Sequence, residues 1–155
     1  EVFNLALLSR QAWRCLTEPL SLSARILKAA YYPNSSIFEA EVGSHPSQIW
    51  RAIYEGKEVL KKGLIRRIGD GKSTSIWNQN WIPRNFMMRA LHPNSLNPPK
   101  NVVELIDTVE RRWNRDRVEQ HMQSIDASEI INIPLSSIPM EDSWACQYEH
   151  NGLFL

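Results

Sequence analysis

Cationic and aromatic side chains are interleaved between Trp50 and Pro83, in the sequence WRAIYEGKEVLKKGLIRRIGDGKSTSIWNQNWIP. Lysine and arginine neutralise the phosphates of a nucleic-acid backbone, and tryptophan rings stack on bases. These residue types therefore predict a surface that contacts RNA or DNA. The candidate phosphate contacts are Arg51, Lys57, Lys61, Lys62, Arg66, Arg67 and Lys72. The candidate stacking residues are Trp77 and Trp81, although most of the six tryptophans are more simply core or boundary residues.

A second kind of chemistry is suggested by Gly71-Lys72-Ser73, because a phosphate-binding P-loop ends in this way. A complete P-loop has another glycine five residues before the first of these, where this chain has Arg66. An Asp-Gly pair between two extended runs is instead typical of a β-hairpin, because both central residues of a type I′ turn need a positive φ. We therefore expect a hairpin turn here and not a nucleotide cradle.

Metal and catalytic sites are not predicted. Cys146 and His150 are four residues apart and His121 lies upstream, but a closed zinc site needs four ligands in a compatible arrangement. A buried cysteine and a surface histidine are the simpler interpretation. Most acidic residues after position 101 lie at expected helix starts, where capping and the helix dipole account for them. We expect no catalytic residues, no metal ligands and no cofactor.

The net charge of +1 hides an asymmetry along the chain. Residues 1–100 carry 14 Lys+Arg and 7 Asp+Glu, whereas residues 101–155 carry 4 and 10. This split favours contact of the first part with a polyanion, although an uneven solvated surface explains it equally well. No apolar run is long enough to span a bilayer. The two cysteines, Cys15 and Cys146, suggest no disulfide framework, which favours an intracellular setting.

Three helices are expected in the first part of the chain. The first covers Phe3 to Leu16, the second follows Ser21, and the third lies between Pro46 and Gly63. Glycine is unfavourable inside a helix, so its presence on the apolar side of the third helix indicates close approach of a neighbouring helix. The expected apolar stripe of this helix consists of Ile49, Ala52, Ile53, Gly56, Val59 and Leu60.

Two hairpins and a linker complete the expected organisation. One hairpin lies near 64–77, and a second, truncated one starts at Trp144 and turns at Asn151-Gly152. We expect a mainly α-helical fold with small β structure. Its three parts are a basic helical region with the first hairpin at 1–83, a proline-rich linker at 84–100, and an acidic helical region at 101–155.

Short blocks spread over nearly the whole chain carry a family resemblance. They are Phe3-Asn4-Leu5-Ala6-Leu7-Leu8, Gln11-Ala12-Trp13-Arg14, Arg25-Ile26-Leu27-Lys28-Ala29, Tyr31-Tyr32-Pro33, Pro46-Ser47-Gln48-Ile49-Trp50-Arg51, Gly63, Arg67-Ile68-Gly69-Asp70-Gly71, Ile76-Trp77 and Trp81-Ile82-Pro83, with weaker echoes further on. In this order they resemble the reverse-transcriptase polyprotein of plant LINE-type (non-LTR) retrotransposons. The similar region lies between the polymerase core and the zinc-binding and ribonuclease H segment.

The resemblance implies thumb-like helices and a connection that contact the template-primer backbone. It also implies that the rest of the polyprotein is a further partner and that the protein acts on nuclear DNA. The polymerase's metal-binding aspartates would precede Glu1 and the zinc ligands would follow Leu155, so we expect a non-catalytic fragment. The chain departs from the family at Asn78-Gln79-Asn80, where an acidic residue is common. The alternative is a structural connector or decayed mobile-element remnant that does not bind nucleic acid.

Overall fold

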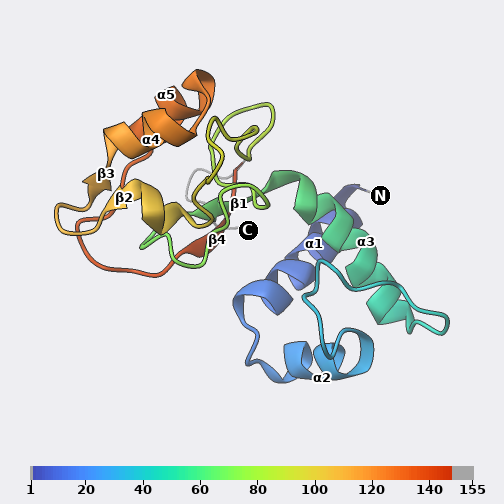
Figure 1. Ribbon diagram of the computed structural model, residues 1–155. Helices are drawn as coiled ribbons and strands as arrows, with labels where there is room; N and C mark the ends of the chain where they lie inside the picture. The colour runs from blue at the N-terminus through green and yellow to red at the C-terminus, as the bar shows by residue number, and fades with distance from the viewer. Residues whose placement is uncertain (1, 148–155) are drawn as a thin grey trace. The chain divides into compact units, whose positions relative to one another are not determined.

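The computed structural model describes residues 2–147, with side chains from Leu7 onward. This part of the chain divides into two compact units, residues 2–64 and Ile65–Gln147. The expected fold class is confirmed, because the structure is mainly helical with small two-stranded sheets (Figure 1). No helix within the described residues is long and apolar enough to cross a membrane.

The first unit consists of three helices, α1 (Val2–Thr17), α2 (Leu22–Tyr31) and α3 (Gln48–Gly63). The helices α2 and α3 begin at serine caps, because the hydroxyl of Ser21 accepts from the Ala24 N–H and that of Ser47 from the Trp50 N–H. In Figure 1, α3 (green) runs alongside α1 (blue). This pair of helices forms the body of the unit.

The close approach expected at Gly56 is confirmed. A Cβ atom added to Gly56 would lie 2.4 Å from the carbonyl carbon of Leu8 on α1, so a larger residue would push the two helices apart. The buried face of α3 is nevertheless rotated from the expected stripe, since Ile49 is 69% exposed while Trp50 is fully buried. Trp50 takes the inner position because its ring stacks on that of Tyr31, with centroids 4.5 Å apart.

The second unit packs short elements around a main apolar core and a smaller cluster of Ile65, Met88 and Ala145. Its strands are β1 (Leu64–Arg67), β2 (Ile106–Asp107), β3 (Arg112–Trp113) and β4 (Ser143–Cys146), and its helices are the 3₁₀ turn η1 (Val102–Leu105), α4 (Arg115–His121) and α5 (Ser124–Asn132). The core is built from aliphatic residues and two tryptophans, namely Ile68, Ile76, Trp81, Ile82, Ala90, Val102, Leu105, Ile106, Trp113, Val118, Met122, Ala127 and Ile130.

The hairpin expected near 64–77 is wrong. Strand β1 pairs with β4, while residues 74–76 lie against 100–102, where Ser75 bridges Asn101. A type I′ turn would need a positive φ at Asp70 and at Gly71, but of these two only Gly71 has one, at 73°. The first arm expected of the C-terminal hairpin is strand β4, and the turn at Asn151-Gly152 lies outside the described residues.

The proline-rich residues 84–100 contain no helix or strand and lie inside the second unit. Arg84 anchors their start, because its buried guanidinium lies 2.7 Å from the buried carboxylate of Asp126 on α5. The same carboxylate accepts a hydrogen bond from the Leu91 N–H at 2.8 Å. A loop held in this way at both ends of residues 84–91 is part of the packed unit.

Candidate nucleic-acid interface

Most of the residues predicted to contact phosphate have side chains that are accessible to solvent. Arg51, Lys62, Arg67 and Lys72 are exposed, and Lys61 is partly exposed. Lys61 lies 3.0 Å from Glu58, and Lys72 lies 3.2 Å from Asp70. Surface pairs of this kind are weak, so both lysines remain available to another anion.

Lys57 is the first exception, because it is buried in the first unit. Its ammonium donates a 2.7 Å hydrogen bond to the carbonyl of Ala40 and lies 3.8 Å from the centroid of the Tyr54 ring. Burial and the neighbouring charge of Lys61 lower the pKa of Lys57, against the raising effect of Glu58. This cation is satisfied within the protein, and the expectation that it contacts phosphate is corrected.

Arg66 is the second exception, because it is buried in the second unit. Its guanidinium donates to the hydroxyls of Ser73 at 2.5 Å and Thr74 at 3.3 Å. The guanidinium also stacks over Trp144, with its Cζ atom 4.7 Å from the centroid of the ring. The neighbouring residue, Arg67, is the last residue of β1, and its side chain lies on the opposite side of the strand from Arg66 and is exposed. The phosphate contact expected at Arg66 is therefore also corrected.

The two candidate stacking residues belong to the core. Trp81 is fully buried and donates from Nε1 to the carbonyl of Ile76 at 3.0 Å. Trp77 is partly buried, packs against the same core and donates to the carbonyl of Pro99 at 2.7 Å. A ring held inside the unit cannot stack on a base, so Trp81 leaves the predicted interface and Trp77 offers only part of its surface.

The P-loop-like sequence forms a cradle for an anion, and that anion is a side chain of the same protein. The Asp142 loop, which we define as residues 69–74, wraps around the carboxylate of Asp142. The carboxylate accepts hydrogen bonds from the N–H groups of Gly69 at 2.7 Å, Gly71 at 2.8 Å and Ser73 at 3.1 Å, and from the hydroxyls of Ser73 at 3.2 Å and Thr74 at 2.7 Å.

This arrangement fixes the charge state of Asp142. Burial raises the pKa of its carboxyl, but the hydrogen bonds from Thr74, Gly69, Gly71 and Ser73 together hold that pKa below its ordinary value. The two glycines are needed, because a Cβ at Gly69 would lie 2.2 Å from the carbonyl oxygen of Met140 and Gly71 has a positive φ. The site is thus occupied by a carboxylate, which leaves no place for a nucleotide phosphate.

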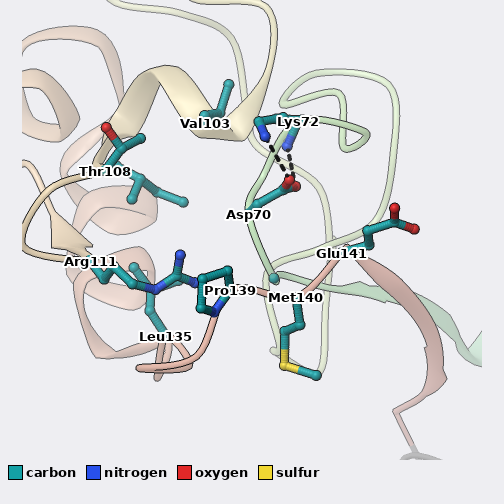
Figure 2. A pocket seen from close by; sticks show the side chains of 11 residues that line it. Asp70, Lys72, Val103, Thr108, Arg111, Leu135, Pro139, Met140 and Glu141 are labelled. Atoms are coloured by element: carbon teal, nitrogen blue, oxygen red, sulfur yellow. Dashed lines mark hydrogen bonds and ion pairs between the residues drawn. The ribbon is translucent and has the colours of Figure 1, made fainter.

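A pocket of about 470 Å³ lies beside this loop in the second unit (Figure 2). Val103, Ile106, Leu135, Pro139 and Met140 supply apolar surface, and Figure 2 shows the ion pair of Asp70 and Lys72 on one side and Arg111 on another. Its volume lies in the range of small-molecule sites. Because acidic and basic groups both line it, the pocket singles out no one class of ligand.

Sequence reasoning missed two features of the second unit. Asp142 carries no local signal, since its partners lie about seventy residues earlier in the chain. The second feature is the arginine segment, which we define as residues 111–117, with the sequence RRWNRDR. Its signal was present, because this is the one place where the otherwise acidic residues 101–155 gather positive charge.

Comparison with known proteins finds a plant relative. The chain is 46% identical over 80 residues to an uncharacterized mitochondrial protein of Arabidopsis thaliana. The similar region covers 52% of this chain and 52% of the relative, so the chain spans about half the length of the curated protein it matches. No protein-family model matches the chain, and no solved structure matches it.

Proposed function

We propose that this chain is a non-catalytic segment of a reverse-transcriptase polyprotein from a plant retroelement, and that it contacts the backbone of RNA or DNA. The similarity to a plant protein supports the plant part of this proposal. The sequence blocks that resemble the LINE-type polyprotein support the rest, with the remaining polyprotein as a second partner. The segment would correspond to the thumb and connection region.

The observation that carries the nucleic-acid contact is a set of unpaired surface cations. Arg51, Lys62 and Arg67 are exposed, and none of them forms an ion pair or side-chain hydrogen bond with the described residues. A cation that forms no ion pair within the protein gives up only its hydration when it meets a phosphate. Binding then gains free energy from the counterions that the nucleic acid releases.

A salt titration tests this function. We expect the affinity of the full chain for an RNA–DNA hybrid to fall steeply with salt concentration. We expect a shallower salt dependence for the α3 variant, which combines R51Q, K61Q and K62Q. The matched control removes three exposed cations from α1 and α2 with R10Q, R25Q and K28Q. The control loses the same charge outside the proposed contact set, so it should retain more of the salt dependence.

The alternative is a structural connector without nucleic-acid binding. The internal use of Lys57, Arg66 and Trp81 favours it, because part of the basic and aromatic content serves folding. Weak and salt-insensitive binding of the hybrid, unchanged in the α3 variant, would support the connector and contradict the first proposal.

A further inference from the structure

The arginine segment borders a hollow of about 300 Å³ in the second unit. Arg111, Arg112 and Arg115 line it together with Trp113, Ile131 and Leu135. Three arginines line this hollow and no acidic residue does, so its lining carries a net positive charge. Arginine forms paired hydrogen bonds with phosphate and tolerates contact with flat apolar surface, which makes this set suitable for a phosphate ester.

The three arginines differ in how firmly they are held. Arg111 is anchored, because its guanidinium donates to the carbonyls of Ser136 at 2.8 Å and Ile138 at 3.4 Å. Arg112 lies 2.7 Å from Glu110, but both side chains are more than half exposed, so the pair holds it weakly. Arg115 is exposed and forms no side-chain hydrogen bond or ion pair with the described residues. Two weakly held cations therefore lie beside an anchored one.

A neighbouring hollow of about 320 Å³ shows why the first is the better anion site. Arg112, Trp113 and Arg115 line this second hollow too, but Asp107 and Asp116 line it with them. Its charges balance, whereas the lining of the first hollow carries positive charge alone. The carboxylates of Asp107 and Asp116 would repel an anion from the second hollow, whereas the arginines of the first hollow would attract it.

We propose that the hollow beside Arg111 binds one phosphate unit of a single-stranded nucleic acid, with Arg112 and Arg115 on the phosphate. This inference rests on the proposed function, that the chain contacts nucleic acid. The hollow has the size of the smallest ligand pockets, which suits one nucleotide better than a duplex. The apolar side chains of Ile131 and Leu135 would lie against an unstacked base, whose face a duplex keeps covered.

The experiment measures the affinity of the full chain for a short fluorescent oligo(dT) strand over a range of salt concentrations. Each phosphate contact with a single strand contributes about 0.7 to the slope of log affinity against log salt. We expect the R112Q and R115Q double variant to lower the slope by about 1.4. Arg89→Gln and Lys100→Gln together are the matched control, since both residues are exposed on the same unit and outside the hollow.

The outcomes separate this inference from the proposed function. A slope lowered by the arginine double variant and kept by the control supports the site. An unchanged slope, an equal change in the control, or an equal change with a duplex of the same sequence would overturn it. If the α3 variant loses salt dependence while the arginine variant keeps it, only this inference fails. If the reverse is found, the site stands and the α3 contacts fail.

Discussion

The Asp142 loop and the arginine segment are both charge-rich stretches of the second unit, yet their polar groups meet different partners. In the loop, backbone N–H groups, two hydroxyls and the guanidinium of Arg66 converge on one another and on Asp142. In the arginine segment, Arg112 and Arg115 stay in solvent. The difference is that Asp142 supplies a carboxylate to the Asp142 loop, whereas no acidic residue lines the hollow beside the arginine segment.

This comparison shows that a basic sequence does not by itself indicate a binding surface. A cation is available to a ligand only where no acceptor inside the protein already takes its hydrogen bonds. Arg66 and Arg67 are adjacent and chemically identical, but only Arg67 is free to meet a ligand. Substitutions in the two regions test whether the hydrogen bonds of the Asp142 loop stabilise the protein and whether the arginine segment is accessible to a ligand.

The largest expected effect is that of Asp142→Ala. The variant leaves the donors of Gly69, Gly71 and Thr74 without their acceptor, and hydrogen bonds to a charged group contribute about 1.5–3 kcal/mol each. Because water can replace part of them, we expect the free energy of unfolding to fall by about 3 kcal/mol. Urea denaturation measures this loss. Glu141→Ala is the control, since that exposed carboxylate accepts no hydrogen bond from the described residues.

The pH dependence of the same variant gives an independent check. The pKa of Asp142 is lowered in the folded protein, so its stabilising effect is complete above its unfolded pKa, near 4, and is lost as the pH falls through the folded value. The difference in unfolding free energy between the natural chain and Asp142→Ala should be constant from about pH 5 to 8 and shrink below about pH 4. A difference that grows in acid would contradict the hydrogen-bonded carboxylate.

A smaller effect is expected from Arg66→Lys. The ammonium keeps the charge but cannot reproduce the planar fork that reaches Ser73 and Thr74 while stacking on Trp144. We expect a loss of about 1–2 kcal/mol in unfolding free energy, against less than about 0.5 kcal/mol for the control Arg67→Lys. Equal losses at the two positions would show that the buried guanidinium adds nothing to the closed loop.

Local patterns predicted the helices well, because caps and glycine positions act within a few residues. Ser21 caps its helix as expected, and Gly56 lies at the predicted contact. The face of α3 was less well predicted, since hydrophobicity alone ranked Ile49 with the core. The stacking of Trp50 on Tyr31, a residue of another helix, decides which side is buried.

The strand pairing and the candidate site depended on distant residues and escaped sequence reasoning. Asp70-Gly71 is a good hairpin turn locally, but Asp142 draws the N–H groups of the loop inward and leaves β1 to pair with β4. The same long-range contact decides that Arg66 is internal. Only the arginine segment could have been identified from sequence, by its positive charge within an acidic region.

The smallest expected effect concerns the backbone that anchors the arginine segment. Arg111 has a φ of 51°, a conformation that costs a residue with a Cβ about 1 kcal/mol and costs glycine little. Both Arg111→Gly and Arg111→Ala lose the hydrogen bonds to Ser136 and Ile138, so their difference isolates the backbone. We expect Arg111→Gly to be more stable than Arg111→Ala by about 0.5 kcal/mol. The difference is smaller than the backbone cost because glycine also gains conformational entropy in the unfolded state, which offsets part of the relief.

The adjacent strand residue Arg112 provides the control for this last comparison. Its φ is not positive, so glycine there gives no relief and the order should reverse, with Arg112→Ala more stable than Arg112→Gly. Thermal unfolding of the four variants measures both differences. The same order at the two positions would mean that the turn does not hold Arg111 in the left-handed region. The backbone turn would then contribute nothing to the position of Arg111, and only its hydrogen bonds to Ser136 and Ile138 would hold it beside the hollow.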